Sequence, residues 1–107
     1  MDANMSPRIV GVVKAISEPN RIRILYQLRK ADSAPSPSRM QSRCPTNRGE
    51  LCACKLPDLI GLTQPAVSLH LKVLLKAGLV QVRLEGSNRM YSITPLGRRV
   101  LSDIIRW

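Results

Sequence analysis

The three cysteines of this chain are the residues whose type and spacing offer the clearest chemistry. Cys52 and Cys54 form a C-x-C pair, and Cys44 lies eight residues before Cys52. An odd number of cysteines, in a chain that starts without the apolar core of an export signal, argues against a disulfide framework. Thiolates are soft ligands that select thiophilic ions. We therefore expect thiols that react or bind an ion.

The position of the C-x-C pair suggests how such an ion would act. We expect a short helix over about 54–60, with Cys52 and Cys54 at its beginning, where the helix dipole favours thiolates. Residues two positions apart on an ideal helix point about 200° apart, so both thiols cannot face one ion while this segment stays helical. Ion binding should then distort the start of the helix. The alternative is that Cys52 and Cys54 are small buried apolar residues and that Cys44 is a loop bystander.

A second set of residues belongs to a helix that we expect over residues 63–77. Its apolar residues recur at helical spacing and form a core-facing stripe: Val67, Leu71, Leu74 and Leu75. The start and the opposite side of this helix form a candidate DNA-reading surface: Thr63, Gln64, Ser68, Leu69 and Lys72. Leu69 is the apolar member of this surface and would suit a thymine methyl group. The alternative for the whole set is an ordinary solvated face.

Residues 80–93 alternate between apolar and polar side chains around a Gly-Ser-Asn turn, which predicts a β-hairpin. Arg83 and Arg89 on this hairpin are candidates for contacts with the DNA backbone or the minor groove. A short helix, a turn, an amphipathic helix and a basic hairpin together describe a winged helix-turn-helix. The sequence therefore predicts a DNA-binding fold.

The remaining elements are expected to complete one domain over residues 1–107. Apolar stripes predict helices over 6–16, about 20–31 and 95–106. Residues 32–49 contain several Pro and Ser without periodicity, which predicts a flexible insertion or loop. The predicted fold is thus mainly α with a small β-hairpin, in the order α-α-α-α-β-β-α.

The composition favours duplex DNA as the partner. The chain carries 17 Lys+Arg against 7 Asp+Glu, a formal net charge of +10 that would attract a phosphate backbone. It has no Phe, one Trp and two Tyr, which argues against single-strand readers that stack bases on aromatic rings. No apolar run approaches the roughly 20 residues of a membrane span, so we expect a cytoplasmic protein without a membrane partner. No nucleophile–base pair, carboxylate dyad or Gly-rich phosphate loop is visible, so we do not expect an enzyme.

Two segments resemble the ArsR/SmtB family of metal- and metalloid-responsive repressors. GELCACKL, residues 49–56, resembles the G-E-L-C-x-C-x-L box of the arsenical-responsive members, and QPAVSLHLKVLLKAGLV, residues 64–80, resembles the recognition-helix block. The resemblance covers nearly the whole chain apart from residues 32–49. It implies a homodimeric repressor that binds operator DNA. The first and last helices would form the dimer interface. It also implies release from DNA when arsenite or a soft metal binds.

The ligand set implied by this resemblance centres on Cys52 and Cys54. Members with this box often carry a third Cys three residues after the pair, where this chain has Pro57. Cys44 is the remaining thiol and can complete a three-sulfur site, since closing a short flexible loop costs little entropy. Three thiolates suit three-coordinate As(III) better than a structural zinc, which needs four ligands. Sb(III) and Cd(II) are further candidates. His70 is expected to pack and form hydrogen bonds rather than bind an ion.

Two alternatives to an arsenite-responsive repressor stay open at this point. The first is a thiol redox-sensing repressor, in which Cys44 and either Cys52 or Cys54 oxidise to a disulfide. The second is a DNA-binding regulator or chromatin-like protein whose cysteines are inert, so that it shows no response to metals. Tight binding to random duplex DNA would favour the second.

Overall fold

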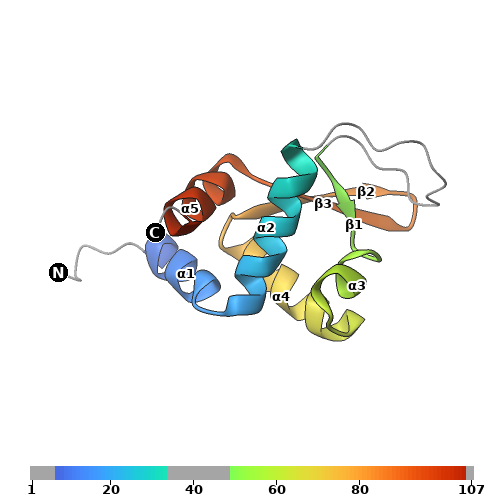
Figure 1. Ribbon diagram of the computed structural model, residues 1–107, viewed down its shortest axis with the longest axis horizontal. Coiled ribbons are helices and arrows are strands. Elements are labelled where there is room, and N and C mark those ends of the chain that lie inside the picture. Colours follow the sequence, from blue (N-terminus) through green and yellow to red (C-terminus); the bar gives the residue numbers. More distant parts are fainter. Residues whose placement is uncertain (1–6, 34–48, 106–107) are drawn as a thin grey trace.

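The computed structural model describes residues 7–33 and 49–105, which form helices and one small sheet (Figure 1). The elements in chain order are α1 (Pro7–Ile16), α2 (Pro19–Ser33), β1 (Leu51–Cys52), α3 (Leu56–Ile60), α4 (Gln64–Lys76), β2 (Val80–Glu85), β3 (Asn88–Ile93) and α5 (Pro95–Ile105). The predicted mainly helical class with one hairpin is confirmed. Among the described residues, no helix has the length and apolarity needed to cross a bilayer.

The sheet is antiparallel with the strand order β1-β3-β2. β2 and β3 form the predicted hairpin, which pairs Val80 with Ile93 at its base and turns at Gly86, whose φ is 62°. β1 pairs with β3 through Leu51↔Tyr91 and Cys52↔Met90. The predicted order α-α-α-α-β-β-α lacked β1 and is corrected here. A strand of two residues has no periodicity of its own, and it exists because β3, far away in the sequence, offers it a pairing edge.

The hydrophobic core is centred on α2, which crosses the middle of the molecule in Figure 1. Ile24, Leu25 and Leu28 are completely buried, and α2 packs against α3, α4, α5 and β3. Tyr91 and Ile93 of β3 belong to the same cluster of buried residues. α2 is therefore the element against which α4 and the hairpin are both positioned.

α4 has the orientation that its sequence predicts. Val67, Leu71 and Leu74 are buried, and Leu75 is partly buried against the core. At its start, Thr63 Oγ1 accepts a hydrogen bond from the Ala66 backbone N–H at 3.3 Å and caps the helix. Its end is set by the backbone at Gly78, where φ is 79°. The adjoining Leu79 N–H donates to the Leu74 carbonyl at 3.0 Å, which closes the last turn.

α5 begins at Pro95 as predicted and is seated against the base of the hairpin. Thr94 Oγ1 accepts from the Gly97 N–H at 3.0 Å and donates to the Gly78 carbonyl at 2.7 Å. A Cβ at position 97 would lie 2.2 Å from the Leu79 carbonyl oxygen, so only glycine allows this approach.

The insertion predicted over residues 32–49 begins later than expected. α2 continues to Ser33, because Arg98 Nη1 of α5 donates to Asp32 Oδ2 at 2.7 Å and holds the last turn of α2. Residues 34–48, for which a loop is predicted, lie outside the described residues, and so does Cys44.

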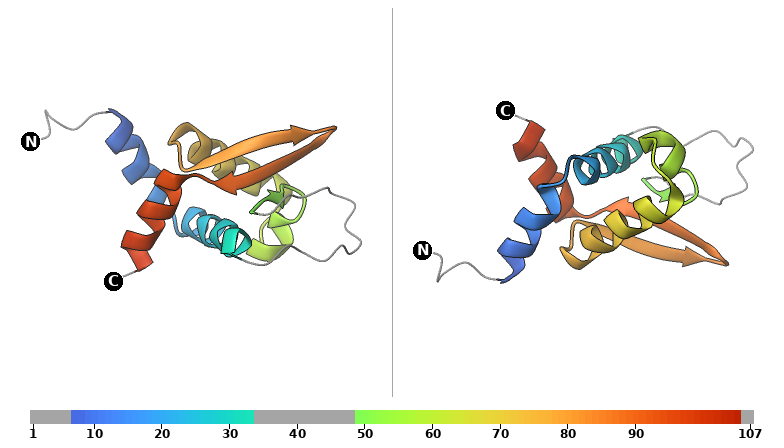
Figure 2. Two further views of the ribbon diagram at one scale, coloured as in Figure 1. Left: turned by 90° about the horizontal axis from the view of Figure 1, so that it is seen from above. Right: turned by 90° about the horizontal axis from the view of Figure 1, so that it is seen from below.

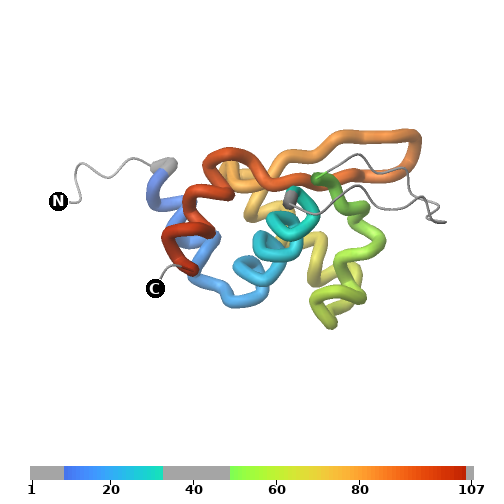
Figure 3. Tube along the Cα trace, turned by 45° about the horizontal axis from the view of Figure 1, so that its top comes forward, coloured from blue at the N-terminus to red at the C-terminus, as the bar shows by residue number. Residues whose placement is uncertain are grey.

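The molecule has two ends built from different elements, which Figures 2 and 3 show from other directions. α1 and α5 lie together at one end. The tip of the β2–β3 hairpin lies at the other end, on the same side of the molecule as α3 and β1. Cys52, the last residue of β1, therefore lies away from the end that carries α1 and α5.

Candidate functional site

The C-x-C pair lies in a tight turn that we call the thiol turn, residues 52–55. Cys52 is the last residue of β1, and the Lys55 N–H donates to its carbonyl at 2.9 Å, which closes the turn. The two sulfur atoms, Cys52 Sγ and Cys54 Sγ, are 2.8 Å apart. The Cys54 backbone N–H lies 3.5 Å from Cys52 Sγ and donates to it. One thiophilic ion can therefore contact both sulfurs without a change of fold.

This geometry corrects the expectation that the pair opens a helix. α3 begins at Leu56, so both Cys52 and Cys54 precede it, and the argument that an ion must unwind its first turn is wrong. Pro57 explains the boundary. Its missing N–H and its fixed φ suit the first turn of a helix but not its interior, so α3 does not extend back to Cys52. Because α3 has only 5 residues, the predicted help from a helix dipole is also small.

The two thiols differ in their exposure. Cys52 is buried, with 2% of its surface exposed, whereas Cys54 is exposed. The alternative that both cysteines are small buried apolar residues therefore applies to Cys52 alone. An ion can reach the pair from the Cys54 side. The predicted third ligand, Cys44, lies outside the described residues, and among the described ones no group of three His, Cys, Asp or Glu side chains is placed to hold a metal.

The predicted DNA-reading residues share one surface of α4 and its N-cap. Four polar members are exposed: Thr63, Gln64, Ser68 and Lys72. Leu69 is 64% exposed, on the side opposite the buried stripe. α3, the turn at Gly61 and α4 form the helix-turn-helix, and this packing leaves the outer side of α4 open to a large partner. That the five predicted DNA-reading residues contact DNA stays a prediction.

The two predicted wing arginines have different surroundings. Arg89 is exposed near the hairpin tip. Arg83 instead forms a bidentate ion pair with Glu50, with Nε–Oε2 and Nη2–Oε1 both at 2.9 Å, and a further pair with Glu85. Both carboxylates raise the pKa of the Arg83 guanidinium above its ordinary value. The charge of Arg83 is thus already matched within the protein, which makes Arg89 the stronger candidate for a phosphate contact.

Sequence reasoning missed Glu50 and Met90 as neighbours of the thiols. Glu50 reaches over to β2, and Met90 is the β3 partner of both Cys52 and Arg83. The Glu50–Arg83 and Cys52–Met90 contacts join residues more than 30 positions apart, so no pattern within one segment signals them. His70 has the hydrogen-bonding role predicted for it, since its Nδ1 accepts from Arg21 Nε at 3.2 Å.

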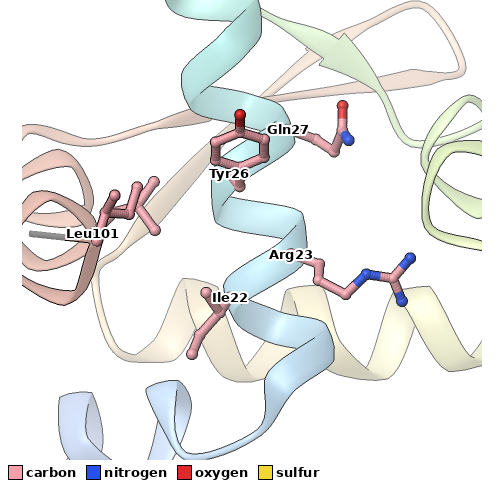
Figure 4. A pocket seen from close by; sticks show the side chains of 6 residues that line it. Ile22, Arg23, Tyr26, Gln27 and Leu101 are labelled. Atoms are coloured by element: carbon pink, nitrogen blue, oxygen red, sulfur yellow. The ribbon is translucent and has the colours of Figure 1, made fainter. Parts of the chain in front are cut away.

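A cavity of about 310 Å³ lies between α2 and α5 and is shown in Figure 4. Ile22 and Tyr26 of α2 line it together with Leu101 of α5. Arg23, at its edge, donates to the Ile60 carbonyl and to Asn20 Oδ1. The walls are thus mainly apolar. The Arg23 guanidinium is already hydrogen-bonded to α3 through the Ile60 carbonyl.

Comparison with known proteins identifies the family and the fold. The family described as "Bacterial regulatory protein, arsR family" matches residues 47–82, from the segment before β1 into β2. An uncharacterised helix-turn-helix transcriptional regulator of Methanocaldococcus jannaschii is 33% identical over 82 residues, which are 77% of this chain and 73% of that protein. An arsenical resistance operon repressor of Staphylococcus xylosus is 32% identical over 82 residues, 77% of this chain and 62% of the repressor.

The solved structures show the same fold. A homodimeric winged helix-turn-helix DNA-binding domain from Mycobacterium bovis, solved by NMR, superposes with a TM-score of 0.68 at 22% identity, over 91% of this chain and 74% of that one. The predicted winged helix-turn-helix is confirmed. These relatives are transcriptional regulators, which confirms that the chain is not an enzyme. By its sequence and its fold, the chain belongs to the arsR family of bacterial regulatory proteins.

Proposed function

We propose that this chain is a metalloid-responsive transcriptional repressor, which binds operator DNA as a homodimer and leaves it when As(III) binds its thiols. Cys52 and Cys54 supply two sulfurs, and Cys44 is the proposed third. Each As–S bond forms as a thiol replaces a hydroxyl of arsenous acid and water is released. Sb(III) and Cd(II) share the preference for sulfur and are the other candidate inducers.

One observation carries the sensing part of the proposal. The Sγ atoms of Cys52 and Cys54 lie 2.8 Å apart in a turn that leads directly into the helix-turn-helix. A chelating pair loses less entropy on binding than two separate thiols, because the fold has already brought the sulfurs together. The naming of several relatives as arsenical resistance operon repressors supports the same reading.

The DNA-binding part rests on α4 and the hairpin. Gln64, Ser68 and Lys72 are proposed to face the major groove, with Thr63 at a phosphate or base and Leu69 at a thymine methyl. Arg89 is proposed to reach the backbone or minor groove. The net charge of +10 provides a sequence-independent attraction to duplex DNA.

The homodimer is proposed to form at the end of the molecule that carries α1 and α5. Five apolar side chains there are more than a third exposed: Ile9, Val10, Val13, Leu96 and Ile105. Tyr26 beside the cavity of Figure 4 adds to this surface. Apolar surface of this kind on a small domain favours burial against a second copy. The homodimeric state named for the Mycobacterium bovis domain supports this arrangement.

The test is a titration of the protein–DNA complex with a panel of ions. The full chain is bound to duplex DNA from the region upstream of its own coding sequence, and to a random duplex of equal length, in a fluorescence anisotropy assay at fixed salt. Arsenite, antimonite, cadmium, zinc and hydrogen peroxide are then added separately. We expect release by arsenite and antimonite at lower concentration than by zinc, and binding to the upstream duplex at least tenfold tighter than to the random one.

Other outcomes would overturn specific parts of the proposal. Release by peroxide but not by arsenite would favour the thiol redox sensor. Equal affinity for the two duplexes, together with no release by any addition, would favour a general DNA-binding protein with inert cysteines. Sedimentation of the protein as a monomer when bound to DNA would contradict the homodimer.

A further inference from the structure

The thiol turn is bonded directly to the wing, the β2–β3 hairpin. Cys52 pairs with Met90 in the sheet. Ala53, between the two cysteines, donates its backbone N–H to the Arg89 carbonyl at 2.9 Å. Arg89 is also the exposed arginine that is proposed to contact DNA. A shift of the peptide between the two thiols is therefore passed by one hydrogen bond to a residue of the wing.

A charged contact adds a second connection. Glu50 immediately precedes β1, and both of its carboxylate oxygens accept from the Arg83 guanidinium at 2.9 Å. The side chain of Glu50 is only 10% exposed and that of Arg83 is 37% exposed. A bidentate pair of this kind fixes orientation as well as distance, because the planar guanidinium fork fits the carboxylate in one arrangement. Since β3 lies between β1 and β2, this ion pair crosses the central strand.

The same residues lie in one row across the sheet. Met90 is the partner of Cys52 on one side and of Arg83 on the other. Directly paired residues of an antiparallel sheet point to the same face, so the Cys52 thiol, the Met90 side chain and the Arg83 guanidinium share a face. Cys52 and Met90 are 2% and 0% exposed, but they lie outside the main cluster of buried residues described here. This face is thus separate from the core that α2 organises.

We propose that the Glu50–Arg83 ion pair is a positioning contact through which an ion on Cys52 and Cys54 moves the wing. The proposal rests on the proposed function. An ion that bonds both sulfurs sets their separation and the shape of the thiol turn. Glu50 is only two residues from Cys52, so it follows the turn, and its fork-like bond to Arg83 carries the change to β2. The hydrogen bond from Ala53 to Arg89 carries it to β3.

The arrangement of the elements favours this route over one through the dimer interface. α1 and α5 lie at the end of the molecule away from the hairpin tip, whereas β1 is part of the same sheet as the wing (Figure 2). A connection made of two hydrogen-bonded strands and one bidentate ion pair is short and continuous. The wing is therefore the first DNA-contacting element that a change in the thiol turn reaches through the sheet.

The test measures the coupling factor, the ratio of the operator Kd with saturating arsenite to the Kd without it. Coupling factors in allosteric proteins are typically about 5- to 150-fold. Glu50→Gln keeps the shape of the side chain and removes its charge. Glu85→Gln is the matched control, because it removes the other carboxylate that pairs with Arg83 but does not touch the thiol turn. Because each ratio compares one protein with itself, a change in basal DNA affinity does not alter it.

We expect Glu50→Gln to lower the coupling factor at least fivefold while its arsenite Kd, measured from the ultraviolet absorption of the As–S bonds, stays within about threefold of the wild-type value. Glu85→Gln should keep the wild-type coupling factor. The charge swap of Glu50→Arg with Arg83→Glu should recover part of the lost coupling. This rescue separates a positioning role from a loss of folding, since each single charge reversal leaves two like charges together.

Unchanged coupling in Glu50→Gln and in Arg83→Gln would overturn the inference and leave α3 as the route to the DNA-reading helix. If wild-type protein binds arsenite but shows a coupling factor of one, the proposed function itself fails. The two failures are thus distinguishable. Hydrogen exchange gives a second readout: arsenite should change the exchange rate of the Ala53 amide in the wild type.

Discussion

Two pairs of residues with the same spacing in the sequence behave in opposite ways. Leu69 and Leu71 of α4 are two positions apart and point to opposite sides, since Leu69 is 64% exposed and Leu71 is 2% exposed. Cys52 and Cys54 are also two positions apart, but their sulfurs lie 2.8 Å from each other. The backbone explains the difference: α4 rotates by about 100° per residue, whereas the thiol turn follows a strand and closes with a hydrogen bond from Lys55 to Cys52.

α4 and the thiol turn are stabilised in different ways. α4 buries one face in the core and leaves the other exposed, and recognition of DNA is proposed for the exposed face. The thiol turn has little core of its own and depends on β3 for its shape. We therefore expect an ion to change the thiol turn more than α4.

Leu71→Ala should destabilise the protein by about 2–5 kcal/mol, because it leaves a cavity in the buried stripe of α4. Leu69→Ala, two residues away, should change stability by less than about 0.5 kcal/mol, because its side chain is exposed. Chemical denaturation at one protein concentration measures both values. Similar losses in the two variants would mean that Leu69 is packed as well as Leu71, which would contradict the difference in their burial.

Lys72→Ala should weaken operator binding several-fold and reduce the magnitude of the salt slope of binding by about 1, if the ammonium contacts a phosphate. A contact with a base in the major groove would in addition weaken binding to the operator more than binding to a random duplex. Binding measured at four or more salt concentrations gives the slope. A slope equal to that of the wild type would remove Lys72 from the phosphate contacts.

Thr63→Ala should cost about 1 kcal/mol of stability, because the Ala66 N–H loses its capping acceptor. Thr63→Ser keeps a hydroxyl and serves as the control, with little expected change. Thermal unfolding followed by circular dichroism measures both. If Thr63→Ala and Thr63→Ser unfold alike, the cap contributes nothing and the start of α4 is held by packing alone.

The helix-turn-helix could be predicted well because the residues that set the ends and faces of α4 lie within one segment. The ends of α4 depend on Thr63 and Gly78, and its faces depend on a repeat within the helix itself, so a single segment carries the information. The start of α5 at Pro95 is equally local.

The candidate thiol site could be predicted only in part. The C-x-C spacing identified the ligands, but their geometry depends on pairing with Met90, and the partner of Arg83 is Glu50, 33 positions away. Such relations are set by the packing of the whole fold. The extension of α2 to Ser33 has the same origin, because Arg98 of α5 holds Asp32.

The most direct test of the account is the coupling factor of Cys54→Ser, measured as the operator Kd with and without saturating arsenite. Cys54 is exposed, so we expect the substituted protein to fold like the wild type. Its operator Kd without arsenite should stay within about twofold of the wild-type value. Wild-type protein should lose operator affinity at least tenfold on arsenite addition, and Cys54→Ser should lose almost none. Release of Cys54→Ser at the same arsenite concentration as the wild type would contradict the account.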